Sequence, residues 1–586
     1  MDIYELMQKI FVPERMIISA NDFTDNDFNE LTDENDRKIF LLLKNIAKIY
    51  VRYKKDVVIL SPAYEMADGR RTFALQDLTD DDYALLYSLN INKLPKTIGL
   101  RVADVLWVGK NDYKMAHFSA KLSYEVYQIF FDKDNWVNCF NFLNHAVGLS
   151  ARIGSKELNI YLQKTYEKVI EMNGSDPQLL SVVLVELLVS YKWSSFDDIL
   201  PILDIIIANS IHNIHRAERA YLLKTKIYHR KNDTQAATDN NKQLAKYLES
   251  VADAEAKNDV PGLFRAEKSY EKAIHLYRNN GASDEGIRVQ TKLIELQKEL
   301  PQHMIPITVK ADATQEYAEV KDLFAGLPIR GKIVRLIQCT PLYKRDFLKK
   351  KVLEDATDPL SCLFGSGIKS AQGQTIIEIP PIDIQNPEAN LEVLELYMHR
   401  QALMMEEICG STVLKWAMDF IIGEKGLSFE DLRFITMDNP IIPLGRENVF
   451  LAGLYYGLVG NLYLALHILA PQVENLFRDI AKHTGGIVST LNDDDTSDAK
   501  LLTSLFETPE LLDCYDNDIL FLFKGMMNEK VGANIRNEIA HGIMSESKGN
   551  SGVARFFYCW VLKLLALTSK EFYEIVDGMK EKNRIL

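Results

Sequence analysis

The stretch LYLALHILAPQVENLFRDIAKH, residues 462–483, has the apolar spacing of an amphipathic α-helix. Its large apolar side chains recur every three or four residues, so they share one face of such a helix. They are Leu462, Leu466, Leu469, Val473, Leu476, Phe477 and Ile480. The opposite face carries Glu474, Arg478 and Lys482 at four-residue intervals, and Pro471 is expected to start or kink a turn. The pattern predicts a helix that packs against other helices on one side.

The segment that leads into this helix, residues 448–470, is long enough to cross a bilayer and contains no Asp, Glu, Lys or Arg. It does contain Asn448, Asn461 and His467, which are costly to place in hydrocarbon. Two buried helices that meet at Gly460–Asn461 explain the pattern better, so we expect no membrane insertion. The N-terminus has early acidic residues and no long apolar core, which argues against a secretory signal.

Composition narrows the class of protein. A chain of 586 residues is too long for one hydrophobic core. Its net charge of −14 argues against a surface that grips nucleic acid along its whole length. The six cysteines show neither CxxC spacing nor a close His/Cys set, so we expect a reducing, cytoplasmic compartment, with no metal site and no cofactor.

The first 300 residues are predicted to be helical. Residues 101–132 have helical apolar spacing on either side of a turn at Gly109–Asn111. Residues 216–230 and 265–279 share small and aromatic positions, as in a tetratricopeptide-like stack of helix pairs. Such a stack is either a surface for a protein regulator or a purely structural layer, and the sequence does not distinguish the two.

Residues 301–390 differ from the rest because they are rich in proline. Within them, 332–339 and 375–384 are predicted to be extended and 365–374 to form a loop. We therefore expect a connecting module with short strands, followed by a helical bundle over 391–586. The apolar stretch 553–576 is predicted to be one long buried helix of that bundle.

The sequence ANIRNEIAHG, residues 533–542, concentrates polar side chains near the C-terminus. Asn534 is a good N-cap and Gly542 a good terminator, so a short helix with His541 in its last turn is expected. On that helix Asn537 and His541 lie about 40° apart around the axis and share a face. Arg536 is about 140° from His541 and flanks the site. Helix termination alone does not explain why these three polar residue types occur together.

These residue types suit chemistry at a phosphodiester. Histidine can transfer a proton near pH 7, with a typical effect of ~10²–10⁴ on rate. Arginine offers a permanently charged fork for phosphate oxygens, and asparagine can orient either group. The carbonyl end of the helix favours a protonated His541. A metal site is a poor fit because the face with His541 offers neither a second histidine nor a carboxylate.

The segment RNEIAHG (536–542) resembles the RNxxxHG signature of a domain family of unknown function. That family belongs to the HEPN (higher eukaryotes and prokaryotes nucleotide-binding) superfamily, which is defined by an Arg-x4–6-His motif. Residues 443–486 are similar to the helices that precede the motif in the family, and 101–116 to an N-terminal segment often found with it.

The resemblance implies a helical bundle that often dimerises, with two copies of the motif at a shared cleft. It also implies a metal-independent endoribonuclease in which a ribose 2′-hydroxyl attacks the adjacent phosphate. In this chain Arg536 would bind the phosphate, His541 would transfer protons, and Asn537 would position His541 or the substrate. A polar or acidic residue on an earlier helix often assists, and Glu474 or Arg478 is the candidate here.

The sequence is compatible with three functions. The first is a ribonuclease, acting on RNA such as tRNA in phage defence or as a toxin, with an N-terminal half that senses or recruits. The second is a non-catalytic helical scaffold that dimerises through its C-terminal bundle. The acidic composition and the lack of a basic, aromatic-rich groove favour it. The third is binding of a free nucleotide at the same cleft.

Overall fold

The computed structural model describes residues 1–54, 56–66, 70–176, 178–191, 193–210, 213–305, 312–355, 365–370, 372–383, 390–423, 426–491 and 497–581. The fold is mainly α-helical, as predicted, with three small two-stranded antiparallel sheets among these residues. The chain divides into two compact units, Met1–Leu296 and Gln297–Leu586. Each is described by itself.

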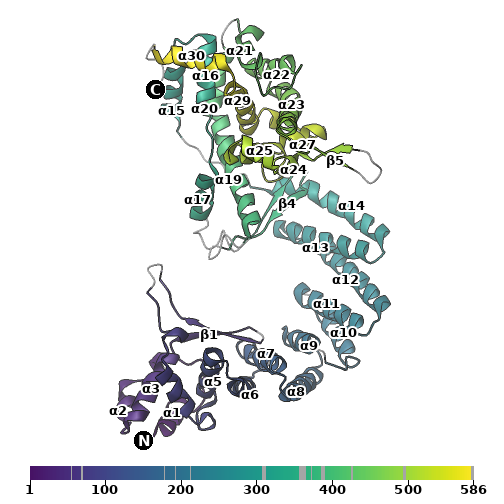
Figure 1. The fold of residues 1–586 in the computed structure, drawn as a ribbon. Coiled ribbons are helices and arrows are strands. Elements are labelled where there is room, and N and C mark those ends of the chain that lie inside the picture. Colours follow the sequence, from purple (N-terminus) through teal and green to yellow (C-terminus); the bar gives the residue numbers. More distant parts are fainter. Residues whose placement is uncertain are drawn as a thin grey trace. The chain divides into compact units, whose positions relative to one another are not determined.

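The N-terminal unit consists of successive helices and one β-hairpin (Figure 1). Its elements are α1 (Ile3–Phe11), α2 (Asp25–Asn29), α3 (Glu34–Ile46), β1 (Ile49–Lys54), β2 (Val57–Pro62), α4 (Asp80–Ser88), α5 (Lys96–Lys110), α6 (Tyr113–Phe130), α7 (Val137–Arg152), α8 (Glu157–Met172), α9 (Leu180–Ser190), α10 (Ile199–Ala208), α11 (Ile214–Arg230), α12 (Thr234–Glu255), α13 (Val260–Asn279) and α14 (Ser283–Glu299). The last of these runs three residues into the second unit.

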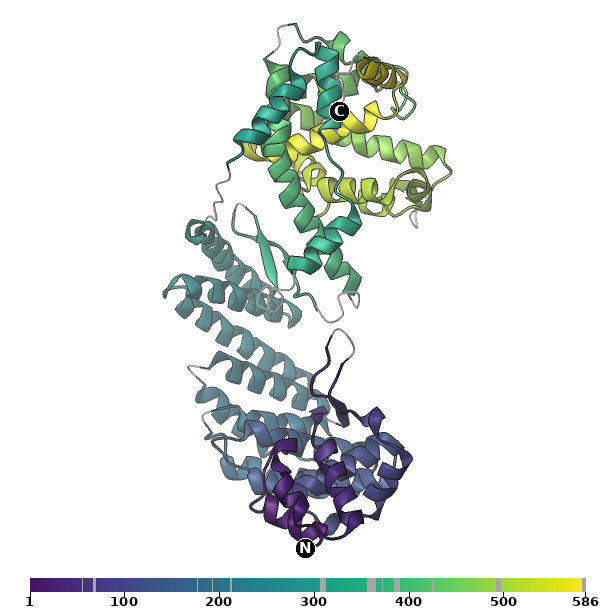
Figure 2. The ribbon, with the colours of Figure 1, turned by 90° about the vertical axis from the view of Figure 1, so that its left-hand side faces the viewer.

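Consecutive helices pack against one another from α5 to α9 and again from α10 to α13, and α9 also packs on α11. Figure 2 shows the helices of this unit from a second side. The predicted turn between α5 and α6 is confirmed, with Asn111 in the left-handed region at φ 53°. The two repeated segments lie in α11 and α13, which both pack on α12. Ala217 and Ala266, at matching positions of the repeat, are fully buried, so small residues do allow close helix packing. The predicted helical character of the first 300 residues is confirmed.

The C-terminal unit is a bundle with two further hairpins. Its elements are α15 (Thr314–Phe324), α16 (Ile329–Gln338), α17 (Arg345–Asp355), β3 (Ser366–Lys369), β4 (Thr375–Ile379), α19 (Leu391–Ser411), α20 (Val413–Ile422), α21 (Arg433–Thr436), α22 (Glu447–Leu458), α23 (Leu462–His483), β5 (Ser489–Leu491), β6 (Ser497–Ala499), α24 (Leu502–Leu505), α25 (Pro509–Cys514), α26 (Asn517–Met527), α27 (Ile535–Ala540), α28 (Glu546–Gly549), α29 (Gly552–Ala566) and α30 (Lys570–Glu581). Helix α29 is almost entirely buried and contacts α16, α19, α20, α22 and α23.

The prediction of an extended segment at 332–339 is wrong, because these residues form most of α16. Its β-branched side chains look strand-like in sequence, yet Ile333, Val334 and Ile337 pack into the core that surrounds α29. The predicted loop at 365–374 is partly wrong, since it contains β3, which pairs with β4. The extended prediction for 375–384 is confirmed over β4, and its last residue lies outside the described part.

The apolar stretch 448–470 forms two helices, α22 and the first part of α23, which meet at Gly460 with φ 89°. The predicted break at Gly460–Asn461 is therefore confirmed, while α23 runs without interruption through Pro471. The expected single helix over 553–576 is wrong. It is two helices, α29 and α30, bent by 97°. Across the described residues, no single helix is both long and apolar enough for a bilayer, and only this bent pair passes that test.

Candidate functional site

The RNEIAHG motif lies on α27, a short helix held closely against α26. Ile535 is buried in the bundle core, and the Ala533 amide donates to the Gly525 carbonyl of α26 at 3.0 Å. A Cβ at Gly532 would lie only 2.0 Å from that same carbonyl oxygen, so the chain needs glycine to pass here. The start of α27 is therefore fixed by backbone contacts, and its polar side chains point away from the core.

The two ends of α27 are capped in different ways. Gly542, at φ 66°, ends the helix as predicted, and the amides of Gly542 and Ile543 donate to the carbonyls of Ile539 and Glu538. This pair of bonds is a Schellman motif. Asn534 occupies the N-cap position, but the prediction that its side chain caps the helix is wrong. Its backbone is left-handed at φ 53°, and its Oδ1 accepts from Asn537 Nδ2 at 2.8 Å instead.

Glu474 links two arginines next to the motif. Its Oε2 accepts from Arg536 Nε at 2.5 Å, and its Oε1 accepts from Arg478 Nη2 at 2.9 Å. The side chains of Glu474, Arg478 and Arg536 are 15%, 20% and 33% exposed. The structure thus brings both residues predicted on the earlier helix into one charged cluster with Arg536. The cluster carries two positive charges and one negative charge, and so a net positive charge.

The two arginines of this cluster have different partners. Arg478 also donates to the carbonyls of Val488 and Lys500, at the base of the β5–β6 hairpin. Arg536 donates from Nη1 to Asn537 Oδ1 at 3.2 Å. Within the described part of the chain, Nη2 of Arg536 has no hydrogen-bond acceptor. Arg478 is therefore occupied in holding local structure, whereas Arg536 keeps a donor edge for another molecule.

His541 occupies the C-cap position of α27 and is exposed. Its ring makes no hydrogen bond to any residue that the structure describes. Asn537 does not contact the imidazole through its side chain, because its Nδ2 donates to Asn534 Oδ1 and, at 3.4 Å, to the Asn528 carbonyl. The only bond between these residues joins the His541 amide to the Asn537 carbonyl at 3.0 Å. Asn537 therefore orients Arg536 rather than the histidine.

Other residues, which the sequence pattern did not reveal, also support the site. Glu538 forms an ion pair with Lys548 at 2.5 Å, which joins α27 to α28. Tyr463 of α23 donates to the carbonyl of Met544 at 3.4 Å, just after the motif. Asn528 is buried beside Asn537, and neither polar atom of its side-chain amide has a hydrogen-bond partner. None of these contacts follows a helical spacing, so no local signal could have identified them.

Comparison with known proteins gives one match. Residues 21–159, in the N-terminal unit, match a family described as a domain of unknown function, DUF7380. Neither a curated protein nor a solved structure matches the chain. The match covers less than half of the chain and does not include the RNEIAHG motif.

Proposed function

We propose that the chain is a metal-independent endoribonuclease of the HEPN type, with its site at RNEIAHG. The observation that supports this most directly is the arrangement on α27. Glu474 holds the guanidinium of Arg536 with one donor edge free, and the imidazole of His541 lies exposed at the end of the same helix. A cation fixed in place and a free imidazole are the two groups that cleavage of a ribose-linked phosphodiester needs.

In the proposed reaction the ribose 2′-oxygen attacks the adjacent phosphorus, and the bond from phosphorus to the 5′-oxygen breaks. The products are a 2′,3′-cyclic phosphate and a 5′-hydroxyl. One proton leaves the 2′-hydroxyl and another reaches the departing 5′-oxygen. Arg536 Nη2 donates to the non-bridging oxygens, where negative charge increases. Since each chain offers one such histidine, a homodimer through the C-terminal bundle would supply both proton transfers at a shared cleft.

On this proposal the substrate is cellular RNA, with tRNA as one candidate, and the setting is cytoplasmic defence against phage or toxin activity. The helical N-terminal unit would carry the regulator. These assignments rest on the motif's resemblance and on the site geometry together.

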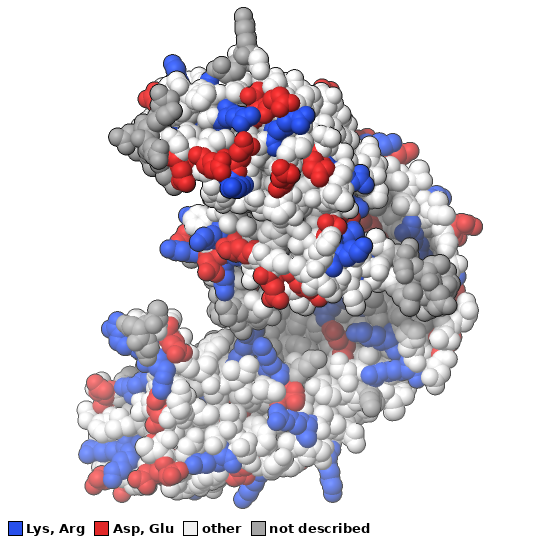
Figure 3. Space-filling view, turned by 45° about the horizontal axis from the view of Figure 1, so that its top comes forward, with Lys and Arg blue, Asp and Glu red and all other residues white. Residues whose placement is uncertain are grey.

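A specific observation favours the alternative of a non-catalytic scaffold or nucleotide-binding protein. The net charge is −14, and Figure 3 shows basic and acidic side chains interspersed on the face in view. RNA bound along a surface usually follows a basic stripe. The nuclease proposal therefore requires a small contact area centred on Arg536.

The test is incubation of purified chain with total RNA in EDTA. Wild type should cleave, and His541→Ala should lose at least about 100-fold in rate, the lower end of the usual contribution of proton transfer. Arg536→Ala should also lose cleavage. His483→Ala is the matched control, since His483 is an exposed histidine at the end of α23 and outside the motif. This variant should cleave RNA like wild type.

Circular dichroism must show every variant folded. Equal cleavage by wild type and all variants would mean a contaminating nuclease and would contradict the proposal. No cleavage by any of them would favour the scaffold. Light scattering tests the dimer, because a monomer at assay concentration would leave the two-histidine cleft incomplete.

A further inference from the structure

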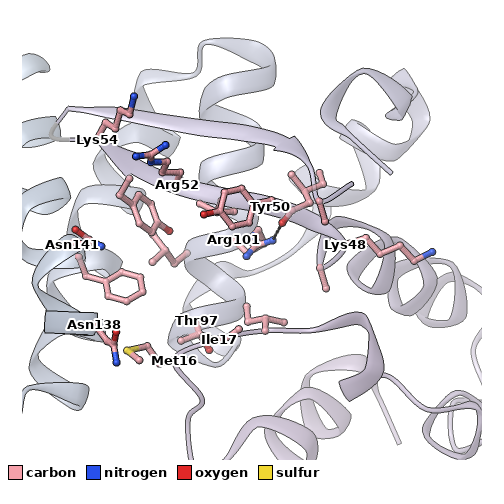
Figure 4. A pocket seen from close by; sticks show the side chains of 18 residues that line it. Met16, Ile17, Lys48, Tyr50, Arg52, Lys54, Thr97, Arg101, Asn138 and Asn141 are labelled. Carbon is pink, nitrogen blue, oxygen red and sulfur yellow. Dashed lines mark hydrogen bonds between the residues drawn. The ribbon is translucent and has the colours of Figure 1, made fainter. Parts of the chain in front are cut away.

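The N-terminal unit contains a cavity of about 690 Å³, far in sequence from the motif. It lies between β1, α5, α7 and the loop that follows α1. Figure 4 shows Tyr50 and Arg52 on the β1 side, opposite Asn138 of α7 and Met16 and Ile17 of the loop. Pockets for small ligands are commonly about 300–1,000 Å³, so this one has room for a ligand of nucleotide size.

The charges that line the cavity are of one sign. Lys48, Arg52, Lys54 and Arg101 are the charged residues of the described lining, and no Asp or Glu accompanies them. Arg52 and Lys54 are exposed and form no ion pair with any described residue. In a chain with net charge −14, such a cluster is unusual. It favours an anionic ligand.

Arg101 is the deepest of these cations and is held in place by backbone. Its Nη1 donates to the carbonyls of Ile46 and Ile49 at 3.0 and 2.7 Å. Neither Nη2 nor Nε has a hydrogen-bond partner among the described residues. The guanidinium therefore has donors left for a phosphate oxygen, in a fixed orientation.

Two carboxylates in adjoining elements are already engaged by other groups. Asp104 accepts from Tyr53 at 2.7 Å and from Ser119 at 2.5 Å. Glu14 accepts from the backbone of Lys96 and from the backbone and hydroxyl of Thr97. Neither forms an ion pair with Arg101, although Asp104 lies near enough to interact electrostatically with its guanidinium. The positive charges of the exposed Arg52 and Lys54 are available to a ligand.

The remaining lining suits a flat ring. Tyr50 is 56% exposed and shares one face of β1 with Arg52 and Lys54, because alternate residues of a strand point the same way. Phe142 and Tyr53 form an aromatic pair, with ring centroids 5.3 Å apart. The amides of Asn138 and Asn141 offer donors and acceptors for the polar edge of a base.

We propose that this cavity binds a nucleoside phosphate, with Arg52, Lys54 and Arg101 on the phosphate and Tyr50 on the base. The cavity residues from Ala47 onward all lie within the region that matches the domain of unknown function, so the inference gives that domain a ligand class. It concerns the other compact unit and does not depend on the proposed nuclease.

Isothermal titration of the full chain tests this directly. The probes are the four ribonucleoside 5′-monophosphates, the four triphosphates, the four unphosphorylated nucleosides and pyrophosphate. At least one nucleotide should bind with a submillimolar dissociation constant. Its nucleoside should bind at least about tenfold more weakly, because it cannot accept the charge-assisted hydrogen bonds. Failure of every nucleotide to bind would overturn the proposal, as would a nucleoside that binds equally well.

Two variants separate the phosphate contacts from the ring contact. Arg52→Ala with Lys54→Ala should weaken both the nucleotide and pyrophosphate, by at least about tenfold. Tyr50→Ala should weaken the nucleotide but not pyrophosphate, because stacking acts on the ring alone. The control for charge is Lys114→Ala with Lys133→Ala. This pair removes two exposed cations of the same unit that do not line the cavity, and binding should stay within about twofold.

Unchanged affinity in the Arg52/Lys54 variant, with circular dichroism like that of wild type, would place the nucleotide elsewhere and overturn the proposal. So would a short oligoribonucleotide that binds when no free nucleotide does, because it would make the face a polynucleotide surface. If binding is lost equally in the control pair, the effect is general electrostatics and the cavity is not the site.

Discussion

Glu474 is the residue on which the geometry of the motif depends most. It lies 62 residues from Arg536 in sequence, yet one carboxylate oxygen meets Arg536 and the other meets Arg478. A single carboxylate between two guanidinium groups lowers the repulsion between them and also orients both. Removing it leaves two partly buried cations without their shared anion, which is more damaging than the loss of a surface ion pair.

We therefore predict that Glu474→Ala lowers the free energy of unfolding by about 1–3 kcal/mol, since the group is mostly buried. Glu474→Gln should cost less, because an amide oxygen can still accept one of the two bonds. The matched control is Glu34→Ala, which removes an exposed ion pair with Lys38 and should cost less than about 0.5 kcal/mol. Urea unfolding measures all three. Equal losses for Glu474→Ala and Glu34→Ala would contradict the central role of Glu474.

Glu406 of α19 gives a prediction about pH. Burial raises the pKa of this carboxyl from 4.5 to about 8, and it has no ion pair among the described residues. Between these two pKa values the folded state holds a proton that the unfolded state releases. The free energy of unfolding is therefore highest below about pH 4.5 and decreases as pH rises toward 8. Glu406→Gln should remove that fall, making the variant more stable than wild type by about 1–3 kcal/mol at pH 7.5.

Thermal or urea unfolding at several pH values, with wild type and Glu406→Gln compared at each, isolates this group from the other titrating residues. A constant difference between the two proteins from pH 5 to pH 8 would show that Glu406 does not titrate in this range.

At the residue scale, the sequence located the motif but not its contacts. The spacing of RNEIAHG was enough to predict a short helix that ends at Gly542. It could not show that Asn534 adopts a left-handed backbone and bonds Asn537, because N-capping and this arrangement use the same residue type. The sequence indicates Glu474 only as a candidate on an earlier helix. Its contact with Arg536 depends on tertiary packing that no local pattern encodes.

At the scale of elements, the close crossing of α19 and α29 organises the C-terminal bundle. A Cβ at Gly410 would lie 1.8 Å from the Gly552 carbonyl oxygen. Beside this contact, the carboxylate of Glu407 accepts from the amides of Gly552 and Val553 at 3.0 and 2.7 Å. The first turn of the buried helix is thus capped by a side chain of another helix, which also places a negative charge at its positive end.

Gly410→Ala should destabilise the bundle by about 1–3 kcal/mol or more, because the methyl group meets backbone that cannot move without separating the two helices. Gly423→Ala is the control. Its new Cβ would be 3.4 Å from the Asp419 carbonyl oxygen, an ordinary contact, so its effect should be within about 0.5 kcal/mol. Chemical unfolding measures the stability of both variants. Similar stabilities would mean that the helices are not in close contact at Gly410.

The sequence predicts helices and turns correctly where the apolar spacing is long and regular. It predicts them wrongly where tertiary contacts determine the secondary structure. The helix at 462–483 and the turn at Asn111 followed directly from local pattern. Residues 332–339 looked like a strand because they are β-branched, but packing on α29 stabilises a helix there. The sequence does not reveal the break between α29 and α30, because the apolar pattern continues across it. There Ser569 accepts from the Phe572 amide and donates to the Phe434 carbonyl.

At the scale of the whole molecule, each compact unit has hydrophobic cores of its own. Leu106 is fully buried in a core built from α1, α3, α5 and α6, all within the N-terminal unit. The core around α29 draws only on residues of the C-terminal unit. Because each unit buries its apolar surface internally, their stabilities should be set largely independently of one another.

We predict two calorimetric transitions for the full chain, each moved by substitutions in one unit only. Leu106→Ala should leave a cavity that destabilises the N-terminal unit by about 2–5 kcal/mol and lowers its transition by several degrees. Gly410→Ala should lower the transition of the C-terminal unit. The double variant should lower each transition by the same amount as the single variant in that unit, since the two sites lie in units with separate hydrophobic cores. If either single substitution moves both transitions equally, the two units unfold as one cooperative structure. A ligand for the N-terminal cavity would then also stabilise the bundle that carries the motif.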